Sequence, residues 1–213
     1  MKTILLYNDI WSFTAESFIE AMNDNADVDK MVRVNCPGGS VFAGWGMCAT
    51  MNQYKENTYI QVDGSAASMG LYFLLYAKKE NVTALNVSRF LIHSAYGDAS
   101  TKEDRDLLDA INNDLRALMH ERFDDAKFEE VVGVSIDSVF DDERKDYWID
   151  AYQARDIGLI GSIHRLSAEE QTAMSKMVAS SSFEVGAKTK DAEEGKPSFA
   201  EWNFNELSNN IKI

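Results

Sequence analysis

Cysteine and histidine are scarce in this sequence. Its 213 residues include only two cysteines, Cys36 and Cys48, and three scattered histidines, His93, His120 and His164. A disulfide framework needs more cysteines, and a zinc site typically shows closely spaced pairs such as CxxC or HxxxH, which the sequence lacks. We therefore expect neither a disulfide scaffold nor a metal site. A reduced, cytoplasmic protein is the simplest interpretation.

Positive charge and long apolar runs are also scarce. Lys and Arg total 21 against 35 Asp and Glu, which gives a formal net charge of −14. Binding to nucleic acid or to an anionic membrane surface needs clustered Lys and Arg, so the composition disfavours both partners. The apolar run in residues 1–11 is too short for a signal peptide, and no segment approaches the ~20 apolar residues of a membrane span.

Segments with strand-like and helix-like patterns alternate along the first half of the chain. The patterns predict strands over residues 2–7, 30–35, 58–62, 82–85 and 89–92, and helices over residues 14–22, 41–54 and 66–77. This order implies parallel strands joined by helical crossovers, which is an α/β fold.

A long amphipathic helix is expected after these segments, over residues 101–123. Ser100 and Glu103 are spaced as a capping box at its start. One side of the helix is apolar and the other is charged. The apolar stripe fits core packing, and a surface that faces a partner is the alternative.

The composition changes after Val178. Residues 179–196 are polar, and a short apolar cluster follows, which contains Phe199, Trp202, Phe204 and Leu207. We therefore expect one folded domain over residues 1–178 and a polar tail over residues 179–213. The tail is either disordered or docks on a neighbouring subunit or a partner.

Ser68 is the first candidate for chemistry. It lies in residues 66–70, AASMG, where a predicted strand ends and a stretch of small residues leads into a helix. This resembles the strand-to-helix elbow that exposes nucleophilic serines, without the full G-x-S-x-G pattern. Taken alone, the pattern also fits a purely structural helix start.

Two further segments supply possible partners for a serine. His93 ends an apolar strand before a loop, where it is either a general base or a core histidine. Residues 37–39, PGG, follow a buried strand and are either a simple turn or a source of free N–H groups for an oxyanion hole. A triad also needs an acid to orient the imidazole, and composition does not choose among five candidates: Asp141, Asp142, Glu143, Asp146 and Asp150.

Four ordered segments together resemble one family, the ClpP peptidases. Residues 35–44, NCPGGSVFAG, are similar to the family's NSPGGxVxAG segment, and residues 64–70, GSAASMG, to its GxAASMG nucleophile motif. Residues 89–93, RFLIH, resemble the segment around its catalytic histidine. Residues 146–160, DYWIDAYQARDIGLI, resemble the segment whose first Asp is the triad acid. The resemblance extends over roughly residues 3–165.

The resemblance implies a role for each matching residue. Ser68 is the nucleophile, His93 the general base and Asp146 the orienting acid, while the backbone N–H groups of Gly39 and Met69 form the oxyanion hole. It also implies a ClpP/crotonase-like fold, a serine endopeptidase that cuts peptides or unfolded proteins, and no metal or organic cofactor. The expected assembly is a homo-oligomer, either a ring of seven subunits or two stacked rings.

Some features depart from the family pattern. Asp150 and Gln153 stand where the family has Ser or Thr and Glu, and the loop before Asp146 is longer. The first residues resemble the family's first core strand, so we expect the segment that forms the axial entry loops to be missing, and docking of a Clp-type ATPase is left open. Such chains resemble phage or prophage members.

Several alternatives to a ClpP-type peptidase are kept. A capsid-maturation protease would use the same chemistry, and a scaffold that retains the fold would be catalytically idle. A crotonase-type enzyme would bind an acyl-CoA. A signal-peptide-peptidase-like enzyme would use a Ser–Lys dyad.

Overall fold

The computed structural model describes residues 1–24, 27–141, 145–167 and 169–170. Met1–Arg165 form one compact unit, and Leu166–Ile213 form a second unit, of which only the first few residues are described. The expected tail over residues 179–213 therefore lies outside the described residues. Among the described helices, none is long and apolar enough to cross a membrane.

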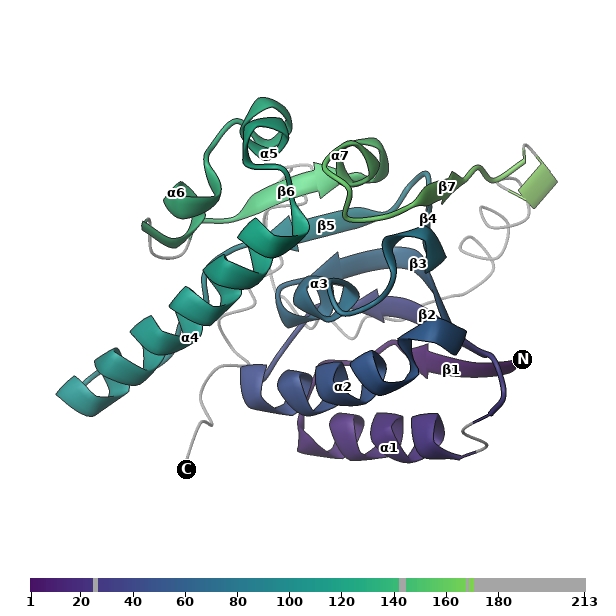
Figure 1. Ribbon diagram of the computed structural model, residues 1–213, viewed down its shortest axis with the longest axis horizontal. Coiled ribbons are helices and arrows are strands. Elements are labelled where there is room, and N and C mark those ends of the chain that lie inside the picture. The colour runs from purple at the N-terminus through teal and green to yellow at the C-terminus, as the bar shows by residue number, and fades with distance from the viewer. Residues whose placement is uncertain (25–26, 142–144, 168, 171–213) are drawn as a thin grey trace, which may run out of the picture. The chain divides into compact units, whose positions relative to one another are not determined.

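A mostly parallel sheet forms the centre of the first unit (Figure 1). Five strands lie in the order β1-β2-β3-β4-β7 and all pair in parallel. The long strand β3 pairs along its second half with β5, also in parallel, and β6 is antiparallel to β5. The strands are β1 (Lys2–Leu6), β2 (Lys30–Cys36), β3 (Thr58–Ala67), β4 (Val82–Leu85), β5 (Arg89–Ile92), β6 (Tyr147–Asp150) and β7 (Ser162–His164).

Helices connect these strands, so the expected α/β fold with parallel strands and helical crossovers is confirmed. Side chains alternate along each strand between the two faces of the sheet. Ile4, Val32 and Ile60 are buried in the core, whereas Leu5 is 64% exposed. The helices are α1 (Ser12–Asn23), α2 (Val41–Tyr54), α3 (Met69–Leu74), α4 (Lys102–Arg122), α5 (Asp125–Val132), α6 (Ile136–Asp141) and α7 (Ala151–Asp156).

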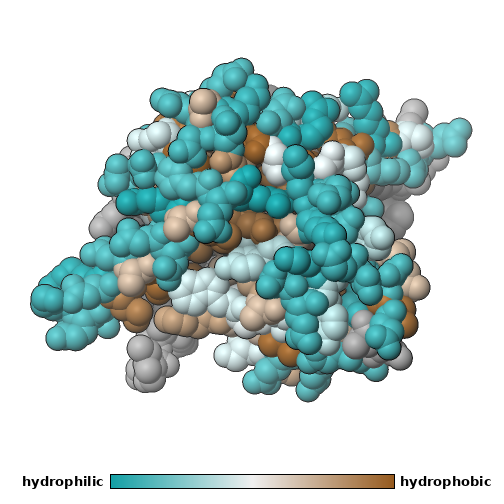
Figure 2. All heavy atoms as spheres, viewed as in Figure 1, coloured by the Kyte–Doolittle hydropathy of each residue, from teal (hydrophilic) through white to brown (hydrophobic). Residues whose placement is uncertain are grey.

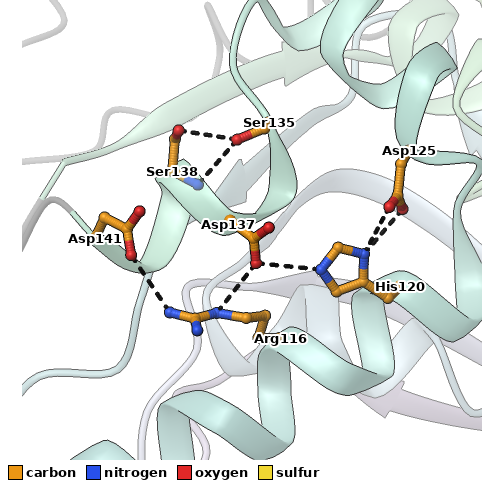
Figure 3. A network of polar contacts seen from close by, with 7 residues as sticks. All are labelled: Arg116, His120, Asp125, Ser135, Asp137, Ser138 and Asp141. Carbon is orange, nitrogen blue, oxygen red and sulfur yellow. Dashed lines mark hydrogen bonds and ion pairs between the residues drawn. The ribbon is translucent and has the colours of Figure 1, made fainter.

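Helix α4 extends beyond the sheet at its N-terminal end (Figure 1) and is tied to α5 and α6 near its C-terminal end. Arg116 lies 3.6 Å from Asp137 and 3.5 Å from Asp141. His120 Nδ1 lies 2.9 Å from Asp125, and Nε2 lies 3.3 Å from Asp137 (Figure 3). Five charged or titratable groups thus join three helices.

A groove lies beside α4, where the inner side of that helix faces α2. Figure 2 shows apolar residues in the strip between these two helices. Trp45 of α2, Tyr76 after α3 and Leu118 of α4 line the groove. The apolar stripe of α4 also includes Ile111, Leu115 and Met119, which are buried in the core. Core packing therefore accounts for this part of the stripe.

Three local predictions are wrong. Strand β3 does not end at Val62 but continues to Ala67, because its second half pairs with β5 and the backbone N–H of Ser65 donates to Asn35 Oδ1. The helix expected over residues 66–77 is therefore shorter and begins at Met69. The capping box of α4 is formed by Thr101 and Asp104, one residue later than the Ser100 and Glu103 expected.

Candidate active site

The candidate residues follow the carboxyl ends of three neighbouring strands. Gly38 and Gly39 follow β2, Ser68 follows β3, and His93 follows β5. Strand β3 pairs in parallel with both β2 and β5, so the three strands end at the same edge of the sheet. This edge is where ligands bind in open α/β sheets. The fold therefore brings together segments that are up to 55 residues apart in the sequence.

Ser68 forms a sharp turn between strand β3 and helix α3. Its φ of 53° and ψ of −128° make it the only described non-glycine residue with positive φ. Its N–H donates to the carbonyl of Leu91 at 3.1 Å, and its carbonyl accepts from Leu71 at 2.8 Å. These two bonds hold the strained residue between β5 and α3. Such strain clusters at functional sites, and a strand-to-helix elbow is the setting of nucleophilic serines.

The Gly38–Gly39 turn packs directly against this elbow. A Cβ atom on Gly38 would lie 2.6 Å from Ser68 Cβ and 2.7 Å from the carbonyl oxygen of Ala67. A Cβ atom on Gly39 would lie 2.3 Å from the carbonyl oxygen of Ile10. The φ angles of Gly38 and Gly39, 103° and 143°, also favour glycine. Both glycines are therefore required by close backbone approach as well as by backbone conformation.

Two backbone donors near Ser68 have no partner. Within the described part of the chain, neither the N–H of Gly39 nor that of Met69 has a hydrogen-bond acceptor. Met69 is the first residue of α3, where helix geometry leaves the N–H group free. An oxyanion hole needs free N–H groups beside the nucleophile. These two groups are the ones that the sequence resemblance implied.

His93 is held at the end of β5 with only 6% of its surface exposed. Its Nδ1 atom lies 2.6 Å from the carbonyl oxygen of Ser94. A proton on Nδ1 satisfies this carbonyl and leaves Nε2 able to accept a proton. Burial lowers the pKa of His93 below 6.5, while the Ser94 carbonyl and the charge of Asp146 act in the opposite direction. The imidazole is therefore neutral at pH 7, as a general base requires.

Asp146 directly precedes β6 and lies across from His93, which directly follows β5. The antiparallel pairs run from Arg89 with Asp150 to Ile92 with Tyr147, so the next position of the same register sets Asp146 opposite His93. Asp146 is exposed. No hydrogen bond among the described residues joins His93 to Asp146 or to Ser68. The structure thus brings the three residues to one edge of the sheet without bonding them directly.

The other candidate acids that the structure describes are engaged elsewhere. Asp141 forms an ion pair with Arg116 on α4. Asp150, at the far end of β6, accepts hydrogen bonds from the N–H groups of Tyr152 and Gln153 at 2.9 Å, and Gln153 Oε1 accepts from the Asp150 N–H at 3.0 Å. This capping box starts α7. Asp142 and Glu143 lie outside the described residues.

Sequence reasoning missed two residues that contact the segment after β5. The hydroxyl of Tyr72 donates to the carbonyl of His93 at 2.9 Å. The side-chain amide of Asn112 bonds both backbone groups of Ala95. One signal was available, because Asn112 is a polar residue within the apolar stripe of α4, between Ile111 and Leu115. A half-buried amide at such a position is expected to have a specific partner.

The chemistry that this arrangement supports is nucleophilic and acid–base. No group of three or more His, Cys, Asp or Glu residues that could hold a metal ion occurs in the described ranges. The arrangement instead offers a strained serine, a neutral imidazole, an acid opposite that imidazole, and two free backbone donors. These are the groups that acyl transfer by a serine hydrolase uses.

Comparison with known proteins gives one consistent family. The Clp protease family model matches residues 1–166. The ATP-dependent Clp protease proteolytic subunit 2 of Treponema pallidum is 32% identical over 171 residues, covering 76% of this chain and 81% of the relative. Subunit 3 of Parasynechococcus marenigrum is 32% identical over 166 residues, covering 76% and 82%. The proteolytic subunit of Bacteroides fragilis is 27% identical over 168 residues, covering 76% and 78%.

Proposed function

The chain belongs to the Clp protease family, and from this we propose that it is a serine endopeptidase that uses Ser68, His93 and Asp146. The observation that carries the proposal is the backbone of Ser68. A non-glycine residue with a φ of 53° requires support from its surroundings, and here it follows a buried strand and lies against a glycine turn. The free N–H groups of Gly39 and Met69 support the same reading.

The proposed reaction proceeds in two acyl-transfer steps. Nε2 of His93 takes the proton of Ser68 Oγ as this oxygen attacks the carbonyl carbon of the substrate peptide bond. The N–H groups of Gly39 and Met69 donate to the oxyanion that forms. When the C–N bond breaks, His93 returns the proton to the leaving amine, and an acyl-enzyme remains on Ser68. Water, deprotonated by His93, then attacks the acyl-enzyme; the ester bond to Ser68 breaks, His93 returns the proton to Ser68 Oγ, and the second product leaves.

Asp146 stabilises the imidazolium that forms on His93 in each step. Its position opposite His93 in the β5–β6 register supports this role, as does the effect of its charge on the pKa of His93. Catalytic hydrogen bonds are often long or absent without substrate and tighten when it binds. We therefore expect substrate to bring Ser68 Oγ into contact with Nε2 of the imidazole, while Nδ1 keeps its bond to the Ser94 carbonyl and Asp146 acts on the imidazolium through its charge.

The proposed setting is a homo-oligomer in the cytoplasm. A ring of seven subunits, or two stacked rings, rests on the resemblance to ClpP peptidases, and the exposed N-terminal half of α4 supplies a surface for contact between subunits. Cys36 and Cys48 are both free and buried, which suits a reducing compartment. The relatives are subunits of ATP-dependent proteases. For this chain, we propose hydrolysis of small peptides without ATP.

Labelling with a fluorophosphonate probe tests the nucleophile, and a fluorogenic peptide tests turnover. The wild-type protein should be labelled on the peptide that contains Ser68 and should cleave the substrate without ATP. Ser68→Ala should lose both activities, since triad knockouts lower kcat by about 10⁴-fold or more. Ser65→Ala is the matched control, because Ser65 lies in the same segment and its hydroxyl contacts Asn35.

The proposal is wrong if Ser68→Ala keeps more than a few per cent of wild-type turnover. Light scattering coupled to gel filtration tests the assembly on the same samples. A monomer at micromolar concentration would contradict the ring. An assembled protein that is labelled but does not cleave the small peptide would contradict hydrolysis without a partner.

A further inference from the structure

The loop that follows His93 is held by side chains from two other elements, Tyr72 of α3 and Asn112 of α4. We propose that Asn112 is a positioning residue for His93 and acts through the peptide unit between Ser94 and Ala95. This proposal rests on the function proposed above, in which His93 is the general base.

The contact between Asn112 and Ala95 is reciprocal. Oδ1 of Asn112 accepts from the N–H of Ala95 at 2.7 Å, and Nδ2 donates to the carbonyl of Ala95 at 3.1 Å. A side-chain amide can donate and accept at the same time, whereas a carboxylate only accepts and an apolar side chain does neither. The amide of Asn112 therefore matches both backbone groups of one residue.

The same peptide unit holds the imidazole. The carbonyl of Ser94 and the N–H of Ala95 belong to one planar peptide bond, so fixing the N–H also fixes the direction of the carbonyl. That carbonyl lies 2.6 Å from Nδ1 of His93. A continuous line of hydrogen bonds therefore runs from Asn112 through one peptide plane to the imidazole. Hydrogen bonds in such a chain polarise and strengthen one another.

Tyr72 holds the other side of His93. Its hydroxyl donates to the carbonyl of His93 at 2.9 Å and lies 3.7 Å from Met119 Sδ on α4. Tyr72 is 2% exposed, and burial raises the pKa of its hydroxyl, so the group keeps its proton and remains a donor. Both residues link the histidine segment to α4. A change in the position of α4 would thus be transmitted to the imidazole.

The test compares substitutions on two adjacent asparagines. Asn112→Leu removes both hydrogen bonds at similar size, and Asn112→Asp keeps the acceptor and loses the donor. Asn113→Leu is the matched control, because Asn113 is exposed on the same helix. We expect Asn112→Leu to lower kcat on the order of 10- to 100-fold, because small displacements of catalytic groups have effects of that size. KM should change by less than about twofold, because binding common to substrate and transition state is untouched.

The pH profile separates positioning from a general loss of folded protein. If the loop loosens, water reaches His93 and its lowered pKa rises, because burial is the largest effect on this pKa and outweighs the loss of the Ser94 bond, which acts in the opposite direction. The apparent pKa of kcat/KM should therefore rise in Asn112→Leu and stay unchanged in Asn113→Leu. A loss of folded protein would lower kcat in proportion to the folded fraction and leave the apparent pKa in place.

A second readout does not depend on activity. Diethyl pyrocarbonate modifies neutral imidazole, and mass spectrometry of the digested protein reports the rate at each of the three histidines. His93 is buried and should react slowly in the wild type, with His120 and His164 as internal references. Asn112→Leu should raise the rate at His93 several-fold relative to these references, and Asn113→Leu should not.

Each outcome decides one of the two proposals. If Asn112→Leu and Asn112→Asp keep the kcat, pH profile and His93 reactivity of the Asn113→Leu control, Asn112 does not position His93. If Asn112→Leu does not fold, Asn112→Asp gives the same test at smaller cost in packing. If turnover is missing in the wild type or survives in Ser68→Ala, the proposed function fails, while the reactivity of His93 still decides the role of Asn112.

Discussion

Gly38→Ala gives a direct test of how the glycine turn and the serine elbow depend on each other. The added Cβ atom would lie 2.6 Å from Ser68 Cβ and 2.7 Å from the carbonyl oxygen of Ala67. Both neighbours are rigid parts of the elbow, so they cannot rotate away as the end of a long side chain could. The two Cβ atoms must separate by roughly 0.8 Å to reach van der Waals contact.

The magnitude follows from this displacement. A shift of ~1 Å in a reacting group can lower the rate about 10²-fold, which corresponds to about 2.7 kcal/mol of transition-state stabilisation. Alanine at a φ of 103° adds strain of about 1–3 kcal/mol to the folded state. We therefore expect Gly38→Ala to lose about 10²-fold in kcat/KM and to unfold at a lower temperature than the wild type.

The assay is hydrolysis of a fluorogenic peptide, together with the rate of fluorophosphonate labelling at Ser68. Gly97→Ala is the control, because a Cβ atom there meets nothing within 4 Å. Labelling should slow in parallel with turnover in Gly38→Ala, since both need the Ser68 oxygen in place. A Gly38→Ala protein whose kcat/KM and labelling rate match those of Gly97→Ala would refute the reasoning.

Three further predictions concern charged groups. The kcat/KM of the wild type should rise with pH to a plateau with an apparent pKa below 6.5, because burial lowers the pKa of His93 and only the neutral imidazole is a base; a midpoint above 7 contradicts this. Asp146→Asn should lower kcat by about 10²-fold or more, whereas Asp141→Asn should keep wild-type turnover, as measured on the same peptide. Asp125 and Asp137 raise the pKa of His120, so its stabilising charge is present below pH 6.5 and is lost as pH rises through the raised pKa. His120→Gln should accordingly lower the thermal midpoint of unfolding at pH 5.5 and not at pH 9. A loss of ~1 kcal/mol in the free energy of unfolding corresponds to at most about 4 °C, and an equal loss at both pH values would contradict the prediction.

The parallel pairing of the strands was predictable because it follows from the alternation of strands and helices. Short apolar segments separated by helical ones leave few alternatives to parallel strands, and the chemistry of such sheets lies after the carboxyl ends of the strands. Local periodicity did not predict the course of residues 63–67. Asp63, Gly64 and Ser65 are turn-forming types, yet they continue β3, because Arg33 and Gln61 bond the side chain of Asp63 and β5 pairs with the strand beyond it. Tertiary contacts thus overrode local preference.

The sequence pattern also could not predict the backbone conformation of Ser68. Nothing in residues 66–70, AASMG, specifies a positive φ at Ser68, because this backbone conformation is unfavourable for serine as for most residues other than glycine. The strain persists because the elbow is held at both ends, by the Leu91 carbonyl before the turn and by the first turn of α3 after it. Such support comes from strands that are distant in sequence, and only the packed sheet supplies it.

The departures at Asp150 and Gln153 show how a pattern can change while its physical role is kept. The family has Ser or Thr at the first of these positions and Glu at the second, a spacing that is itself a capping box. Here the carboxylate of Asp150 accepts from the N–H groups of Tyr152 and Gln153, and the amide of Gln153 accepts from the N–H of Asp150. Both pairs satisfy the free donors at the start of α7. These two differences from the family pattern therefore do not argue against catalysis.

The choice of acid depends on register and not on composition. Five acidic residues lie between positions 141 and 150, and in the sequence they are equivalent in chemistry. Pairing β6 antiparallel to β5 separates them, because each residue of β6 then faces a fixed residue of β5. Asp150, the last residue of β6, pairs with Arg89 and caps α7. Asp146 directly precedes β6 and lies opposite His93. A shift by one residue would turn the side chains of β6 to the opposite face and remove Asp146 from that position. The buried Ile149, which pairs with Phe90, opposes such a shift, so the apolar packing of β6 also keeps Asp146 opposite His93 in the register.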